Sequence, residues 1–331
     1  MPTHSTATVL PVGGPLVTVI GESLADIIDD PRRGTAGRHV HPGGSPLNVA
    51  VGTARLGLPT SLVTHYDDDA YGLMVEQHLR ANGVVPVRGG TAPTSTATAT
   101  LGHDGAATYT FDVTWDINGA LFPALAAVEA STHVHTGSIA TLLSPGNHAT
   151  LALVEAARRG ATVSYDPNCR PGVSPDVASA RRQAEDFVAA SDIVKASDED
   201  LMWLYPHRTP EESLAAWLEL GPVLVALTRG AQGPVLVNRQ GRVELPGESI
   251  DVADTVGAGD SFMATLVFGL SQLDLLGAHA RSRLVALTLA ELRVLAAYAN
   301  RAAAITCSRP GANPPTSAEL DPINPATAWR D

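Results

Sequence analysis

The sequence has few of the features that mark secreted or membrane proteins. It contains only two cysteines, Cys169 and Cys307, which are too few for a disulfide framework. No apolar run reaches the roughly 18 residues of a membrane-spanning helix. Residues 1–14 lack the basic segment followed by an apolar run that is typical of a signal peptide. These absences favour a reducing compartment, and we expect a cytoplasmic protein.

Positive charge is also scarce. The chain has 22 Lys and Arg against 34 Asp and Glu, a net charge of -12, which disfavours nucleic acid or an anionic membrane as a partner. Aromatic residues make up only 5% of the chain, which disfavours a slot that stacks the base of a nucleoside. An apolar content of 44% in 331 residues is typical of a globular protein with one large domain.

From residue 133 onward, apolar β-branched segments alternate with segments of helical period. This alternation predicts βαβ units, a mostly parallel sheet and helices on both faces, so the fold class is α/β. The N-terminal half adds strands at 16–20 and 61–65 and helices at 48–58 and 72–82. The later predicted strands are 133–135, 162–166, 193–195, 223–228 and 235–238, and the later helices are 149–159, 175–190, 198–204, 210–219, 261–270 and 291–306.

Residues 254–260 read Asp-Thr-Val-Gly-Ala-Gly-Asp and precede an apolar helical segment. Gly257, Ala258 and Gly259 at a helix start would leave backbone N–H groups free for phosphate oxygens. Asp260 would lie in the first turn of that helix, where it suits a base for a hydroxyl that attacks phosphorus. The alternative is a glycine turn in which Asp260 merely caps the helix.

A second motif, Pro-Gly-Gly-Ser-Pro-Leu-Asn-Val-Ala at 42–50, lies about two hundred residues before the first. Together the two motifs resemble the signatures of the ribokinase/PfkB family of sugar kinases, and the resemblance runs from about residue 16 to 318. The stretches Gly-Glu-Ser-Leu-Ala-Asp at 21–26 and Asp-Pro-Asn-Cys-Arg at 166–170 are most similar to those of bacterial fructokinases.

The resemblance implies a ribokinase-like three-layer sandwich with a mostly parallel central sheet and a small β-sheet lid. The kinase domain would span 15–318, the lid would come from about 27–41 and 94–113, and 1–14 and 319–331 would be loose termini. It also implies ATP and Mg²⁺, a K⁺ ion in many members, and a homodimer formed through the lids. The segment 94–111 alternates Thr and Ala and then reads Thr-Tyr-Thr-Phe, which itself predicts two strands around a turn.

Five residues are candidate sugar contacts. Carboxylate and amide groups suit a polyol because each can bond two hydroxyls, and the planar fork of an arginine can clamp phosphate or sugar oxygens. Without the resemblance, Asp26 would be interpreted as a solvated loop acid and Asn48 as a helix cap. Arg170 would be interpreted as half of an interdomain salt bridge. The candidates are Asp26, Gly43, Gly44, Asn48 and Arg170.

Six further residues match positions that lie along ATP in the family. Among them Lys195 reads equally well as a phosphate contact or as half of a surface ion pair, and the glycines at 228–233 read alone as an ordinary turn. The six are Asn168, Lys195, Thr228, Gly230, Gly233 and Asn300.

The candidate magnesium-binding residues depart from the family pattern. Ser-Asp-Glu-Asp at 197–200 occupies the place of an N-x-x-E motif, so Asp200 and Glu199 are candidates to hold Mg²⁺ through water. The resemblance also implies that Asp254 and Gly311 contribute to a monovalent-cation site.

The sequence thus predicts ATP-dependent phosphorylation of a primary hydroxyl of a free monosaccharide, most readily fructose, with Asp260 as base. Ribose, 2-keto-3-deoxygluconate, another polyol or a nucleoside remain as alternative acceptors. A non-catalytic sugar- or nucleotide-binding regulator on a kinase fold is the alternative of another class.

Overall fold

The computed structural model describes residues 14–32, 37–102, 107–174 and 176–320. The predicted loose termini at 1–14 and 319–331 lie almost wholly outside these residues, as do the two tips of the predicted lid at 33–36 and 103–106 and the first residue of the predicted helix 175–190.

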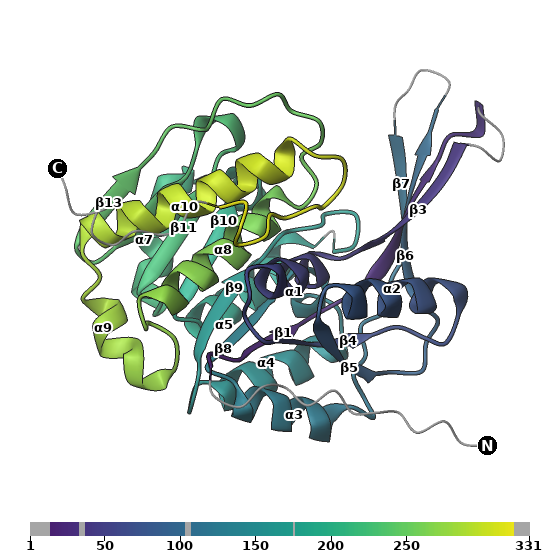
Figure 1. The fold of residues 1–331 in the computed structure, drawn as a ribbon, viewed down its shortest axis with the longest axis horizontal. Coiled ribbons are helices and arrows are strands. Elements are labelled where there is room, and N and C mark those ends of the chain that lie inside the picture. Colours follow the sequence, from purple (N-terminus) through teal and green to yellow (C-terminus); the bar gives the residue numbers. More distant parts are fainter. Residues whose placement is uncertain (1–13, 33–36, 103–106, 175, 321–331) are drawn as a thin grey trace.

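A nine-stranded sheet forms the centre of the molecule (Figure 1). Its strand order is β13-β12-β11-β10-β9-β8-β1-β4-β5. The strands from β11 to β5 run parallel, whereas β12 and β13 pair antiparallel at one edge. The bounds are β1 Val17–Ile20, β4 Thr60–His65, β5 Val84–Gly89, β8 His133–Gly137, β9 Thr162–Asp166, β10 Ile193–Ser197, β11 Leu224–Thr228, β12 Val235–Asn238 and β13 Gly241–Glu244.

Helices cover both faces of this sheet. Successive strand residues point to opposite faces, so Val19 packs with α1, α2, α8 and α10 while Ile20 packs with α3, α4, α5 and α7. No helix in the described ranges is long and apolar enough to cross a membrane. The bounds are α1 Ser45–Arg55, α2 Ala70–Ala81, α3 Leu121–Ala130, α4 Gly146–Ala157, α5 Val177–Ala189, α6 Asp198–Leu204, α7 Pro210–Leu220, α8 Ala258–Gln272, α9 Arg281–Val285 and α10 Leu289–Cys307.

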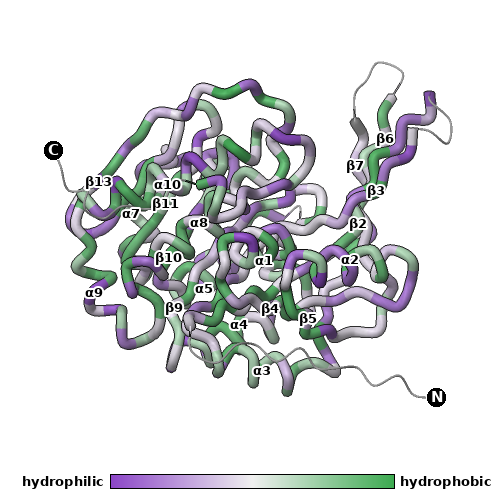
Figure 2. The backbone as a smooth tube through the Cα atoms, in the orientation of Figure 1, coloured by the Kyte–Doolittle hydropathy of each residue, from purple (hydrophilic) through white to green (hydrophobic). Residues whose placement is uncertain are grey.

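A separate four-stranded sheet projects from the body at the α2 side (Figure 1). Its strand order is β3-β2-β6-β7, and only the central pair β2–β6 is parallel. The outer part beside β3 is hydrophilic, in contrast to the strands at the centre of the molecule (Figure 2). The bounds are β2 Leu24–Asp29, β3 Arg38–Gly43, β6 Ser95–Leu101 and β7 Ala107–Asp112. The mostly parallel central sheet with helices on both faces and the small separate sheet, as the resemblance implies, are confirmed.

Local signals explain several of the helix starts. Capping boxes, in which side chain and backbone of two residues bond each other reciprocally, begin α6, α7 and α10. Pro46 occupies the first turn of α1, where its missing N–H costs no hydrogen bond. The predicted helix 48–58 therefore begins three residues earlier than predicted, directly after Gly44.

Among the strands and α-helices of the described residues, β5, β13, α3 and α9 have no counterpart among the predicted elements. Pro86 lies inside β5 and Pro123 inside the first turn of α3. Proline usually argues against a strand, but β5 is an edge strand of the sheet, where one N–H can be spared. In α3 the proline falls among the N–H groups that have no helical partner in any case.

The parallel strands bring the predicted site residues to one edge of the sheet. Asp166 ends β9, Ser197 ends β10 and Thr228 ends β11. Ligands of open α/β sheets bind beyond such carboxyl ends, and the small sheet lies over the same side of the body.

Candidate active site

The turn before α8 places a left-handed glycine at the start of a buried helix. Gly257 has φ 76° and ψ 2°, a conformation that residues with a side chain rarely adopt. A Cβ on Gly259 would lie 2.8 Å from Lys195 Nζ, so the backbone and this cation approach closely. The N–H of Ala258 donates to the carbonyl of Thr255 at 3.3 Å. Of the three predicted N–H donors, those of Gly257 and Gly259 have no acceptor in the described chain and stand at the positive end of the helix dipole.

Asp260 lies in the first turn of α8 and faces α1. It is only 8% exposed, yet both carboxylate oxygens have donors. Ser45 Oγ donates to Oδ1 at 2.6 Å, and Asn48 Nδ2 donates to Oδ2 at 2.8 Å. The predicted base and the predicted sugar contact Asn48 are therefore brought together across the chain. Sequence analysis does not single out Ser45, although it lies on the same helix face as Asn48, three positions earlier.

Asp26 lies on strand β2 of the small sheet, so the alternative of a solvated loop acid is wrong. A Cβ on Gly43 would lie 1.9 Å from Asp26 Oδ2, so only glycine leaves room for this carboxylate. Burial raises the pKa of Asp26 to about 6; the charge of Arg170 lowers it, while the charge of Asp260 raises it further. Asp26, Arg170 and the predicted base Asp260 thus interact electrostatically around one space.

Arg170 follows β9 and is exposed. Its Nη1 donates to the carbonyls of Asn168 at 3.2 Å and Cys169 at 3.0 Å. Within the described residues it forms no ion pair with a carboxylate, so the predicted alternative of an interdomain salt bridge is not present there. The rest of its guanidinium remains free to bind an anion or a hydroxyl.

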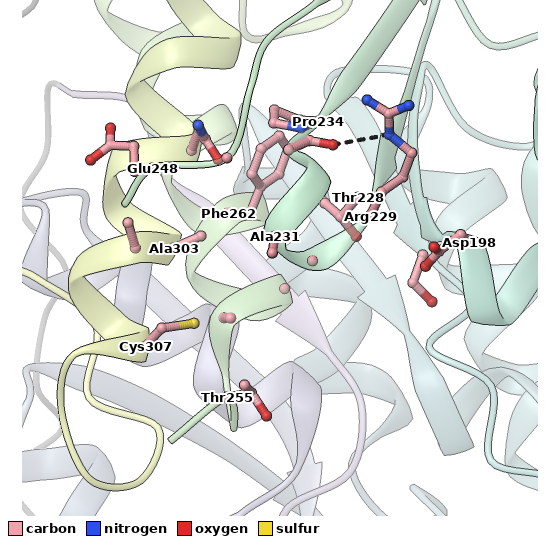
Figure 3. A pocket seen from close by; sticks show the side chains of 18 of the residues that line it. Asp198, Thr228, Arg229, Ala231, Pro234, Glu248, Thr255, Phe262, Ala303 and Cys307 are labelled. Carbon is pink, nitrogen blue, oxygen red and sulfur yellow. Dashed lines mark hydrogen bonds between the residues drawn. The ribbon is translucent and has the colours of Figure 1, made fainter. Parts of the chain in front are cut away.

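A cavity of about 780 Å³ opens between the carboxyl ends of β10 and β11 and the helices α8 and α10. Ala303 and Cys307 lie on one side of it, and Arg229 and Asp198 lie on the other (Figure 3). Its size suits a nucleotide. All six residues that the sequence places along ATP line this cavity: Asn168, Lys195, Thr228, Gly230, Gly233 and Asn300.

Lys195 forms a buried ion pair with Asp166. The Nζ lies 2.7 Å from Asp166 Oδ2, and the two side chains are 4% and 1% exposed. The alternative of a surface ion pair is therefore wrong, because the pair lies in the interior. Burial lowers the pKa of Lys195, but the charges of Asp166 and Asp200 outweigh it and the pKa is raised. A charged ammonium thus stands between the cavity and the glycine turn.

Asp200 is engaged in capping α6. The N–H and hydroxyl of Ser197 donate to its Oδ2 at 2.8 and 2.6 Å, and the N–H of Cys169 donates to its Oδ1 at 2.7 Å. No group of three or more His, Cys, Asp or Glu side chains within metal-binding range occurs in the described part of the chain. Direct ligation of Mg²⁺ by Asp200 does not fit this geometry. Glu199 is exposed and lines the cavity, which fits an ion held through water.

Asp254 and Gly311, the two residues of the predicted monovalent-cation site, are in direct contact. Asp254 Oδ2 accepts the N–H of Gly311 at 2.9 Å, and its Oδ1 accepts the N–H of Val256 at 3.1 Å. Each carboxylate oxygen keeps a lone pair that faces away from these bonds. The loop 308–314 and the turn at 254–257 are therefore joined beside the start of α8, and the carboxylate of Asp254 supplies the oxygen atoms at this junction.

Glu22 is a buried carboxyl group that the sequence analysis leaves unassigned. It is 3% exposed, and its Oε2 accepts the N–H of Ala140 at 3.0 Å. A Cβ on Gly44 would lie 2.6 Å from the Glu22 carbonyl oxygen, so Glu22 lies directly beside Gly44, one of the predicted sugar contacts. Burial raises the pKa of Glu22 to about 7, although hydrogen bonds from Ser138 and Ala140 oppose the rise.

We expect Glu22→Gln to stabilise the protein more at pH 8 than at pH 5. Glu22 has a pKa of 4.5 when unperturbed and about 7 in the fold, so the native state binds its proton more tightly and loses stability as the pH rises between these values. The full cost, at most about 3 kcal/mol, is present above pH 7 and is removed by a neutral glutamine. Thermal unfolding of both proteins at the two pH values measures the difference. Equal changes in Tm at pH 5 and pH 8 would contradict it.

The sequence matches the family described as pfkB family carbohydrate kinase over residues 15–319. A fructokinase from Rhizobium leguminosarum bv. trifolii is 34% identical over 271 residues, which cover 79% of this chain and 81% of the relative. A fructokinase from Klebsiella pneumoniae is 32% identical over 263 residues, which cover 77% and 84% of the two chains.

Two solved structures share the fold over nearly the whole chain. A fructokinase from Xylella fastidiosa with bound ATP has a TM-score of 0.79 at 25% identity and covers 90% of this chain and 93% of its own. A double mutant of the fructokinase from Vibrio cholerae O395, solved with fructose, ADP and a potassium ion, has a TM-score of 0.74 at 27% identity, with coverages of 90% and 94%. The chain therefore belongs to the pfkB family of carbohydrate kinases and is an ATP-dependent sugar kinase.

Proposed function

We propose that the protein transfers the γ-phosphoryl group of ATP to a primary hydroxyl group of free fructose, with Asp260 as the base. The observation that carries the proposal is the position of Asp260. Its carboxylate accepts hydrogen bonds from Ser45 and Asn48 of α1, and it lies within three residues of the Gly257 turn. A general base must come within hydrogen-bond reach of the attacking hydroxyl. The fructokinases among the relatives support fructose as the acceptor.

In the chemical step the phosphoryl group passes directly from ATP to the sugar, and the protein forms no covalent bond to it. As the bond between the sugar oxygen and the γ-phosphorus forms, the bond from that phosphorus to the β,γ-bridging oxygen breaks and ADP leaves, while the hydroxyl proton passes to Asp260. The N–H groups of Gly257 and Gly259 and the ammonium of Lys195 stabilise the charge on the transferred group. Mg²⁺, if bound with the ATP phosphates, would supply further positive charge, and Glu199 would hold it through water.

The remaining side chains bind and orient the two substrates. Asp26 and the free oxygen of Asn48 accept hydrogen bonds from sugar hydroxyls, with Gly43 and Gly44 leaving space beside them, and Arg170 contributes donors from the opposite side. Along the nucleotide, the loop from Thr228 to Gly233 follows the phosphates and Asn168 lies near them. Asn300 donates to the carbonyl of Pro246 at 3.0 Å, which fixes the wall on which the adenine rests.

An acceptor screen tests this function. ADP release from ATP is measured with fructose, ribose, 2-keto-3-deoxygluconate, tagatose, inositol and adenosine, and we expect the highest kcat/KM for fructose. A higher value for another acceptor would transfer the proposal to that compound. The absence of turnover with every acceptor would contradict it and favour a non-catalytic sugar- or nucleotide-binding regulator.

We expect K⁺ to activate the enzyme through a site at Asp254 and Gly311. A cation there would add positive charge beside the glycine turn, where negative charge develops on the phosphoryl group. Replacing K⁺ with tetramethylammonium at constant ionic strength should therefore lower kcat several-fold, because the organic cation is too large for the site. Equal rates in the two salts would refute the cation site.

The small sheet, proposed as the lid, exposes two large apolar side chains on one face. Ile28 and Tyr109 are 42% and 64% exposed, and both lie opposite Ala99 in the lid, hence on one face of it. We propose that two lids pair through this face in a cytoplasmic homodimer, and a monomeric mass by light scattering would contradict it.

A further inference from the structure

Ser45 is the first residue of α1, directly after Gly44, which has φ 109°. Its side chain has no capping role, because no side chain bonds the free backbone groups at this helix start. The residue is 7% exposed, so its hydroxyl is withdrawn from bulk water. A buried hydroxyl needs a partner, and the partner of Ser45 is the carboxylate of Asp260.

The contact between the two is short. Ser45 Oγ lies 2.6 Å from Asp260 Oδ1, within the range of hydroxyl bonds to an ionised acceptor, which are about twice as strong as neutral ones. The hydroxyl has a single proton to donate. Because Asp260 is 8% exposed, an ionised carboxylate there would lose much of its hydration, and the bond from Ser45 replaces part of it.

Ser45 and Asn48 donate hydrogen bonds to Asp260 from one face of α1. Residues three apart on a helix are neighbours, and here one donates to Oδ1 and the other to Oδ2. Two donors on two oxygens fix the rotation of the carboxylate about its last bond. An ionised carboxylate has about four acceptor positions, so two remain for the hydroxyl of an acceptor.

We propose that Ser45 is a positioning residue for the base: its hydroxyl holds Asp260 Oδ1 in the orientation that receives the proton of the acceptor hydroxyl. This inference rests on the proposed function of Asp260. Ser45 donates its single hydroxyl proton to this carboxylate and contributes to turnover through Asp260 alone. A base that is free to rotate spends less time aligned with the attacking hydroxyl, and small misplacements lower rates strongly.

The test compares Ser45→Ala with wild type in fructose phosphorylation. We expect kcat to fall about 10- to 100-fold, the loss of one hydrogen bond to a charged group, while the KM for fructose changes less than about twofold. Ser45→Thr keeps the hydroxyl and should recover most of kcat. Ser61→Ala is the matched control, since Ser61 is 2% exposed and its hydroxyl bonds Thr18 at 2.7 Å, away from Asp260; it should retain the wild-type kcat.

A double-mutant cycle separates this inference from the proposed function. In single-turnover reactions with Asp260→Asn, adding Ser45→Ala should cause no further loss, because the hydroxyl acts only through the carboxylate. Full additivity of the two losses, or a wild-type kcat for Ser45→Ala, would overturn the role of Ser45 and leave Asp260 as base. A near-normal rate for Asp260→Asn alone would instead overturn the proposed function.

Discussion

Replacing Asp260 with asparagine should lower kcat by about a thousandfold, within the range that general-base catalysis supplies. Asparagine keeps the shape of the side chain but cannot take the proton of the attacking hydroxyl. The proposed sugar contacts Asp26 and Arg170 lie on other elements and are unchanged in this variant. The affinity for fructose should therefore change only a few-fold. Steady-state kinetics gives the first quantity and titration calorimetry with fructose gives the second.

The control for this variant is Asp186→Asn on α5. Asp186 is exposed and lies on the opposite face of the sheet from α8, so the same chemical change there should leave kcat unaltered. Loss of fructose binding together with kcat in Asp260→Asn would mean that Asp260 contributes to binding rather than to proton transfer.

Replacing Lys195 with methionine should cost about 3–5 kcal/mol of folding free energy, the usual effect of leaving one partner of a buried ion pair unpaired. Burial already raises the pKa of Asp166 to about 6 with the lysine in place, so its carboxylate depends strongly on that ammonium. Phosphoryl transfer should fall about 100- to 1000-fold, since one cationic donor to the transferred group is lost. Urea unfolding and steady-state kinetics measure the two effects.

The double variant Lys195→Met, Asp166→Leu separates stability from catalysis. Replacing both partners of a buried pair with apolar side chains is often close to neutral for stability, so we expect most of the folding free energy to return. Activity should stay low, because the Lys195 ammonium no longer faces the glycine turn. Recovery of activity along with stability would show that Lys195 has only a structural role.

The sequence predicts those parts of the fold and site that depend on local pattern. The turn at residues 254–260 can be predicted from its sequence, since glycine at 257 can adopt the left-handed conformation of the turn and Asp260 follows within the first helical turn. Helix α6 matches its predicted bounds of 198–204 because a capping box begins it. The central sheet follows from the alternation of apolar strands and helices.

The parts that sequence cannot predict are set by long-range contacts. Ser45 meets Asp260 across 215 residues, and nothing local to either residue indicates the pairing. Lys195 is an ordinary lysine at the end of a strand until the fold buries it against Asp166. Strand β5 contains Pro86, which only its place at the sheet edge makes acceptable.

The most direct test of the account is ³¹P NMR of the reaction of ATP with fructose. With wild-type protein we predict ADP and one phosphate monoester whose resonance couples to two methylene protons, the signature of a primary hydroxyl acceptor. With Asp260→Asn the same ester should form about a thousandfold more slowly. Inorganic phosphate as the only product of the wild-type protein, or an equal rate of ester formation by Asp260→Asn, would contradict the account.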